Sequence, residues 1–186
     1  MNPAKMSTGF TLVELLVTLL LLSVAVSIAL PGFNQLAKSN QHSAILNKYL
    51  GAFAIARSHA VKSNTIAAIC PLDSSMKCHD NWNNPVSVFP DSDKDQKPDN
   101  NIILRVVSAN EHFNIRSRMG GTGSLHFDRD GMVHGGAGSI VICPKDPNSG
   151  HMTYLAINLG GRARYVTDKD NDGEIILSWG GQIKCP

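Results

Sequence analysis

An almost unbroken run of apolar side chains extends from residue 10 to residue 30. A hydrocarbon core of roughly 30 Å requires about 20 apolar residues in a helix, and this run has that length. One carboxylate, Glu14, stands inside the run. An ionisable group in a membrane span raises the free energy of insertion by about 3 kcal/mol, so Glu14 is expected to interact with a partner rather than to stabilise the helix in the membrane. The pattern therefore predicts a membrane-spanning helix with a functional acidic residue.

Helical periodicity continues beyond this run. Apolar residues return at three- and four-residue steps as far as Val61, and Pro31-Gly32 is expected to kink the helix rather than end it. After Asn64 the chain changes to short β-prone runs separated by Gly, Asn, Asp and Pro clusters. Strands are expected at residues 65–70, 86–89, 102–107, 124–127, 139–143, 153–157 and 165–167. One long helix packed on antiparallel sheet is an α+β fold.

The start of the apolar run resembles the type IV prepilin signature, with Gly-Phe-Thr-Leu-Val-Glu at residues 9–14. The resemblance implies that a prepilin peptidase cuts after Gly9 and that the new amino terminus, Phe10, is methylated. Glu14 would then meet the amine of Phe10 or of a neighbouring subunit in a filament. The run would act first as an inner-membrane anchor and later, among other pilins, as filament core. The alternative is an ordinary signal anchor with a chance Glu.

Length and charge fit a single head on a helical stalk. Of the 186 residues, about 150 follow the anchor, which is enough for one core. The predicted organisation is a leader at residues 1–9, a long helix at residues 10–63 and a β-rich head at residues 64–186. The net charge is only +2, with both signs spread along the head, so any nucleic-acid binding would require a local patch.

Four cysteines, Cys70, Cys78, Cys143 and Cys185, lie beyond the membrane span. A lysine precedes the span, so the positive-inside rule places the head in the oxidising periplasm, where two disulfides are expected. Of the three possible pairings we favour Cys70–Cys78, which closes a short loop, and Cys143–Cys185, which ties the carboxyl end to an interior strand. A zinc site at Cys70, Cys78 and His79 is the alternative, although its spacing matches no common ligand pattern.

Three parts of the chain resemble the FimT/GspH family of minor pilins and pseudopilins. They are residues 56–64 before 69–70, residues 88–91 before 103–105, and residues 127–131 before 142–144. The resemblance covers nearly the whole chain and implies a type IV pilin-like fold. Secretion pseudopilins of this family generally lack paired cysteines, so four cysteines favour the pilus branch.

A glycine and arginine motif follows the strand expected at residues 153–157. Gly160 and Gly161 permit a tight turn with positive φ, and strand periodicity then places Arg162 and Arg164 on one face. Two guanidinium groups side by side suit bidentate contact with successive phosphates. The run Gly161-Arg162-Ala163-Arg164 also matches the Gly-Arg-x-Arg motif of FimT proteins. That resemblance implies that Arg162 and Arg164 bind DNA in natural transformation.

An alternative interpretation is that both arginines form a solvated strand face or pair with the acidic turn at residues 168–172. Lys169 and Lys184 are candidates to enlarge the basic patch, provided that the second disulfide brings the tail beside the hairpin. Contact with the DNA backbone rather than with bases is expected, because no recognition helix or zinc finger precedes the motif. Tyr165 is expected in the core.

Two acidic stretches invite comparison with calcium loops. Asp168-x-Asp170-x-Asp172 begins like an EF-hand loop, but its twelfth position is Trp179 rather than Glu. The stretch at residues 91–95 has the same Asp spacing but is followed by Gln96 instead of Gly. We interpret both stretches as polar turns and expect no metal and no cofactor.

The sequence contains no convincing set of catalytic residues. Ser124, His126 and Asp128 alternate along one expected strand, but working triads assemble from separated segments. We therefore expect no enzyme. The resemblances together imply a FimT-like minor pilin, which moves from the inner membrane to an extracellular pilus and binds DNA. The alternatives are a FimU-like structural subunit of the pilus tip or initiation complex that does not touch DNA, and a type II secretion pseudopilin.

Overall fold

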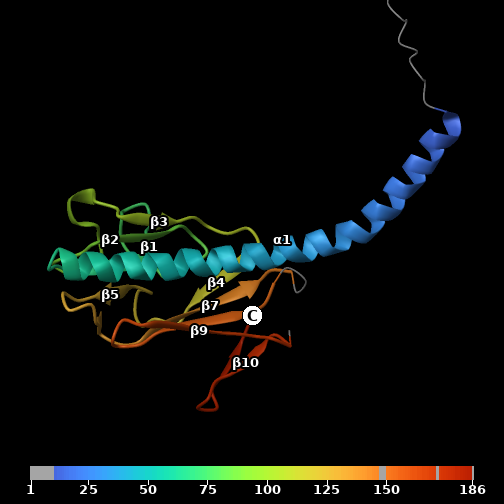
Figure 1. Ribbon diagram of the computed structural model, residues 1–186. Helices are drawn as coiled ribbons and strands as arrows, with labels where there is room; N and C mark the ends of the chain where they lie inside the picture. The colour runs from blue at the N-terminus through green and yellow to red at the C-terminus, as the bar shows by residue number, and fades with distance from the viewer. Residues whose placement is uncertain (1–10, 147–149, 171, 186) are drawn as a thin grey trace, which may run out of the picture. The chain divides into compact units, whose positions relative to one another are not determined.

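The computed structural model describes residues 11–146, 150–170 and 172–185, without the side chains of residues 30–35, 37 and 38. The chain divides into two compact units, Met1–Asn40 and Gln41–Pro186. One long helix, α1 (Leu12–Lys62), belongs to both units (Figure 1). The helix continues through residues 31 and 32 rather than ending there, as predicted.

The first unit contains the apolar part of α1. Leu12–Ala29 has a mean hydropathy of 2.5 and is long and apolar enough to cross a membrane. Thr11 caps the helix, because its Oγ1 accepts a hydrogen bond from the Glu14 amide at 3.3 Å. Thr11 and Glu14 thus occupy the two positions of a Thr-x-x-Glu capping box. A carboxylate at this end of a helix also interacts favourably with the helix dipole. Gly9 and Phe10 lie outside the described residues, so cleavage between them stays a prediction.

The second unit is a head built on the other half of α1. Two antiparallel sheets pack behind this part of the helix (Figure 1). The first sheet has the order β3-β2-β1-β5-β6 and the second has the order β4-β7-β8-β9. The first consists of β1 (Ala67–Pro71), β2 (Val86–Pro90), β3 (Arg105–Val107), β5 (Leu125–Phe127) and β6 (Val133–His134). The second consists of β4 (Phe113–Ser117), β7 (Gly138–Pro144), β8 (Thr153–Ile157) and β9 (Ala163–Thr167), and a short helix, η1 (Asp99–Asn101), precedes β3.

One continuous core joins the helix to both sheets. The buried apolar positions of α1 recur at three- and four-residue steps, as expected of an amphipathic helix. They are Ile45, Leu46, Tyr49, Ala52, Phe53, Ala56 and Ala60. Ile69 of the first sheet and Ile140 of the second are both fully buried in the same cluster. Burial of each such side chain contributes about 1.5–3 kcal/mol, so the helix and the two sheets stabilise one another.

A small hairpin of β10 (Glu174–Ile176) and β11 (Gln182–Lys184) covers the other face of the second sheet. Ile175 and Ile183 of the hairpin pack on Val141 of β7 in a separate apolar cluster. The Cys143–Cys185 disulfide joins β7 to the end of this hairpin, with Cα atoms 5.7 Å apart.

The other disulfide, Cys70–Cys78, closes the loop that follows β1. Both bridges have the pairings favoured from the sequence, and they use the thiols that the alternative zinc site would require.

Four strands were not predicted: β4, β6, β10 and β11. β6, β10 and β11 have only two or three residues each, and β4 buries only Phe113 and Ile115 while its other positions are exposed or half-buried. β10 and β11 each bury a single isoleucine. The expected strand at residues 102–107 begins only at Arg105, and η1 occupies residues 99–101 before it.

Candidate functional site: a basic groove at the β8–β9 hairpin

β8 and β9 form a hairpin in which β9 is the edge strand of the second sheet. Leu155 pairs with Tyr165, and Ala156 pairs with Arg164. Cross-strand partners share a face and neighbouring residues alternate. Since Leu155 is buried against α1, Arg164 lies on the opposite face of the sheet. Arg162 directly precedes β9 and is exposed like Arg164.

The turn of the hairpin is held by Asn158. Its carbonyl oxygen accepts the Gly161 amide at 2.9 Å, and its Oδ1 accepts the Arg162 amide at 2.9 Å. Only Gly161 of the two glycines has a positive φ, of 70°. A Cβ at Gly161 would also overlap the carbonyl oxygen of Gly131. Gly161 therefore has a structural role: it lets the tip of the hairpin approach a neighbouring turn and so positions Arg162.

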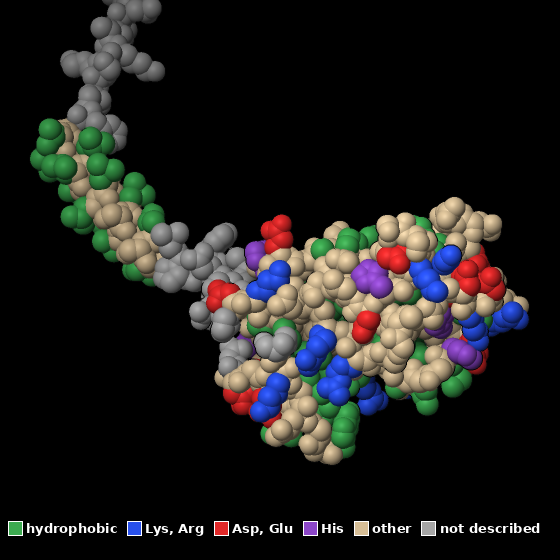
Figure 2. Space-filling view, turned by 180° about the vertical axis from the view of Figure 1, so that it is seen from behind, with side chains coloured by type: hydrophobic (Ala, Val, Ile, Leu, Met, Phe, Trp, Pro, Cys, Tyr) green, Lys and Arg blue, Asp and Glu red, His purple; other side chains and the backbone are tan. Residues whose placement is uncertain are grey.

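Arg162 and Arg164 line a groove of about 460 Å³ together with Arg118 and Trp179. Arg118 directly follows β4, and Trp179 lies in the turn between β10 and β11 with 71% of its surface exposed. Figure 2 views the head from behind Figure 1 and shows basic side chains gathered on this side, next to hydrophobic ones. The groove therefore combines three guanidinium groups with one exposed indole ring.

A second groove of about 810 Å³ lies between α1 and the same hairpin. Arg57 and Lys62 of α1 line it, and Arg162 lines it as well. Arg162 thus stands where the two grooves meet. Five basic residues from α1, the segment after β4 and the β8–β9 hairpin line these two grooves.

Among the described residues, no acidic partner compensates the charges of Arg162 and Arg164. Neither guanidinium lies within 4.0 Å of a carboxylate in the part of the chain that the structure describes. The alternative pairing with the acidic turn is therefore not found among these residues. Asp168 and Asp172 instead accept the amides of Gly173 at 2.9 Å and Glu174 at 2.8 Å.

The acidic turn follows the far end of β9, away from the two arginines. Its carboxyl groups crowd one another. A hydrogen bond with the Asp168 side chain raises the pKa of Asp170, and the nearby charge of Asp172 adds to the rise.

Lys169 and Lys184 were expected to enlarge the patch, but the residues that line the two grooves do not include them. Lys169 follows the far end of β9. The Nζ of Lys184 forms an ion pair with Glu174 Oε2 at 3.1 Å, so its charge is paired within the β10–β11 hairpin. Arg118 and Trp179 supply the additional groove residues. The sequence did not reveal them, because their strands were not predicted.

The expectation for Tyr165 is wrong. It lies on the helix-facing side of β9, yet 54% of its surface is exposed. The reason is that β9 is the edge strand, where the cover of the sheet ends.

Ser124, His126 and Asp128 do not form a catalytic relay. His126 Nε2 donates to Asp91 Oδ2 at 2.9 Å, whereas Asp128 pairs with His134 at 3.0 Å. These interactions join β5 to the end of β2 and to β6, and their role is structural.

A family profile described as type II transport protein GspH matches residues 46–161. This is more than half of the chain. The chain belongs to the GspH family. A second profile, the prokaryotic N-terminal methylation motif, matches residues 4–30 of this GspH-family protein. Members of the family are structural pilins and pseudopilins rather than enzymes.

Solved structures with a similar fold come from the same class of proteins. The type IV minor pilin FimU of Pseudomonas aeruginosa is 16% identical, with a TM-score of 0.51 over 69% of this chain and 97% of FimU. A second crystal form of FimU is 15% identical, with a TM-score of 0.50 over 69% of this chain and 96% of the other. The minor pseudopilin EpsH of the Vibrio cholerae type 2 secretion system is 13% identical, with a TM-score of 0.46 over 69% and 98%. Comparison with curated proteins found no significant match. The likeness to FimU confirms the α+β, pilin-like fold.

Proposed function

We propose that this GspH-family protein is a minor pilin of a type IV pilus and that its head binds the backbone of extracellular DNA for uptake in natural transformation. The observation that carries the proposal is the pair Arg162 and Arg164, exposed in one groove and without acidic partners among the described residues. Unpaired guanidinium groups are the side chains best suited to bidentate phosphate contacts.

The dimensions of the groove fit several phosphates. Arg162 and Arg164 are two residues apart, which is about 6.6 Å along a strand. Each strand of duplex DNA carries one phosphate per 3.4 Å of helix axis, so the two side chains can reach different phosphates. Arg118 follows β4, which lies three strand spacings from β9, or about 14 Å. Arg162 and Arg164 are therefore spaced along β9 while Arg118 lies across the sheet from them, so the three side chains can contact several phosphates rather than a single anion.

The N-terminal segment supplies the route to the filament. Before assembly, Leu12–Ala29 anchors the protein in the inner membrane with the head in the periplasm. The prepilin peptidase cuts after Gly9, and the apolar helix then enters the core of the pilus among other pilins. Glu14 neutralises an adjacent N-terminal amine in this apolar surrounding. The globular head remains at the surface of the pilus, where DNA reaches the groove.

A gel shift with the full chain in detergent micelles tests the proposal. Wild-type protein should shift duplex DNA at low salt, and Arg162→Gln with Arg164→Gln should weaken binding at least tenfold. A control with the same loss of charge is Lys77→Gln with Lys145→Gln, because both lysines are exposed and neither lines the groove. The control should bind like the wild type.

Cells that carry the double-arginine variant should lose transformation while pili remain. No shift by the wild-type protein at low salt would reject DNA binding and favour a FimU-like structural subunit. Normal transformation and piliation, but blocked secretion, after deletion of the gene would favour a secretion pseudopilin.

A further inference from the structure

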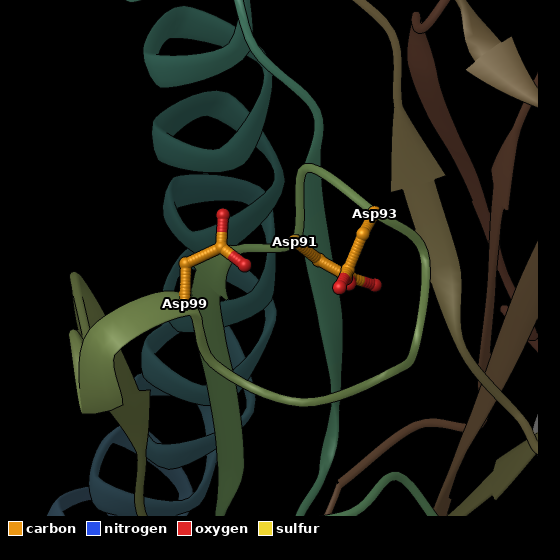
Figure 3. A group of neighbouring side chains, drawn as sticks. All are labelled: Asp91, Asp93 and Asp99. Atoms are coloured by element: carbon orange, nitrogen blue, oxygen red, sulfur yellow. The ribbon is translucent and has the colours of Figure 1, made fainter.

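The loop between β2 and η1 brings three carboxylates together. Asp91, Asp93 and Asp99 each offer one oxygen, and these oxygens all lie within 4.8 Å of one another. Figure 3 shows Asp91 and Asp93 on the same loop with their carboxyl groups next to each other, while Asp99 comes from the start of η1. Asp91 is completely buried, Asp99 is half-buried and Asp93 is exposed, so this group opens to solvent on one side only.

Asp91 leaves one of its oxygens without a partner. Oδ2 accepts a hydrogen bond from His126 Nε2 at 2.9 Å and another from the Gln96 amide at 3.3 Å. Oδ1 is buried and accepts no hydrogen bond from any described residue. A buried polar atom without a partner costs about 1–3 kcal/mol, and more for a charged group. The two neighbouring carboxylates add repulsion of the same sign, so a cation at this position would be stabilising.

We propose that this loop binds one Ca²⁺ ion through Asp91, Asp93 and Asp99. All the donors are oxygens, which hard cations prefer. Ca²⁺ holds oxygens at about 2.3–2.6 Å, so opposite ligands lie roughly 4.8 Å apart, and the three oxygens fit one coordination sphere. Mg²⁺ requires a tighter octahedron with distances of about 2.0–2.1 Å and gives up its waters reluctantly, so a site made of protein oxygens suits it less well.

The backbone of the loop supports the same assignment. Its aspartates at residues 91, 93, 95 and 99 occupy positions one, three, five and nine of a calcium loop. Position six is Gln96 rather than Gly and position twelve is Ile102 rather than Glu, and for these reasons we expected only a polar turn from the sequence. Gln96 nevertheless has a φ of 68°, which is the left-handed conformation that Gly adopts at this position. The loop therefore has the left-handed residue of a calcium loop at position six, although Ile102 at position twelve supplies no closing carboxylate.

Ion binding at this loop would act on the stability of the head. The carbonyl oxygen of Gln96 accepts the Cys78 amide at 3.1 Å, so the loop is attached directly to the Cys70–Cys78 bridge. A cation bound by the three carboxylates would hold the loop after β2 in place against the disulfide-bonded loop after β1. Ca²⁺ should therefore raise the melting temperature of the head.

Isothermal titration calorimetry of the full chain in detergent micelles, after removal of divalent ions with a chelator, tests the site. One Ca²⁺ should bind with a Kd of about 10⁻⁴–10⁻³ M, the range of extracellular modules, and Mg²⁺ should bind more weakly. Asp93→Asn, which changes an exposed side chain, should weaken Ca²⁺ binding at least tenfold and abolish the rise in Tm. Asp99→Asn should do the same.

Two controls separate this loop from other acidic turns. Asp130→Asn changes a turn residue outside the group, and Asp170→Asn changes the second acidic group at residues 168–172. Both variants should bind Ca²⁺ like the wild type. The proposal is overturned if wild-type protein gives neither heat nor a change in Tm up to about 10 mM Ca²⁺, well above the expected Kd. It is also overturned if Asp170→Asn removes binding and Asp93→Asn does not.

Discussion

The two adjacent glycines of the β8–β9 turn should respond very differently to the same substitution. Gly161 has a φ of 70°, and a Cβ there would overlap the Gly131 carbonyl oxygen. The left-handed conformation costs an alanine about 1–2 kcal/mol. Relief of the overlap requires the hairpin tip to move, which strains the hydrogen bond from the Val133 amide to the Leu159 carbonyl oxygen, now 2.8 Å long. Loss of that bond costs about 1 kcal/mol more.

Gly161→Ala should therefore lower the free energy of unfolding by about 2–3 kcal/mol, or the Tm by about 5–10 °C for a protein of this size. Gly160→Ala is the control. Its φ is not in the left-handed region, and a Cβ there would meet only Asn158 Oδ1, at 3.5 Å. This variant should change the Tm by less than about 2 °C. Thermal unfolding of the full chain in detergent, followed by circular dichroism, measures both. Equal Tm values for the two variants would refute the structural role assigned to Gly161.

Three further predictions concern a disulfide, a buried histidine and the exposed tryptophan. Replacing Cys143 and Cys185 with Ser should lower the free energy of unfolding by about 4 kcal/mol, because the bridge spans 42 residues; a loss below about 1 kcal/mol in denaturant unfolding would contradict this. Burial, and then the charge of His151, lowers the pKa of His42 below 6.5. The unfolded chain then binds this proton more readily, so stability should fall as the pH drops below 6.5, and His42→Gln should reduce that fall; an unchanged pH profile would argue against it. Trp179→Ala should weaken binding of a single-stranded oligonucleotide at least threefold and duplex binding less, since unpaired bases stack on an exposed ring; equal losses would exclude stacking.

The long helix and the strands that pack on it could be predicted from the periodicity of apolar residues. Apolar residues at helical spacing set the buried face of α1, and strongly β-prone runs such as residues 139–143 and 153–157 became central strands. The pairing of the cysteines also matched expectation, because a short loop and a tail were the simplest segments to close. These features depend on local pattern, which the sequence carries directly.

The candidate site was only half visible in the sequence. Arg162 and Arg164 belong to a recognisable motif, but Arg118 joins them through the order of strands in the sheet, and Trp179 joins through packing of a hairpin on its outer face. Such neighbours are set by tertiary contacts between distant segments. The same holds for Asp91, whose buried carboxylate lies beside His126 of the distant strand β5.

The most direct test of the central claim is the salt dependence of DNA binding by the full chain in detergent. Each phosphate contact contributes about 0.9 to the slope of log K against log salt concentration for duplex DNA. Replacing Arg162 and Arg164 with Gln should therefore make the slope shallower by about 1.8, and affinity at low salt should fall with it. The Lys77→Gln, Lys145→Gln control should keep both. Wild-type affinity and an unchanged slope in the double-arginine variant would contradict the account.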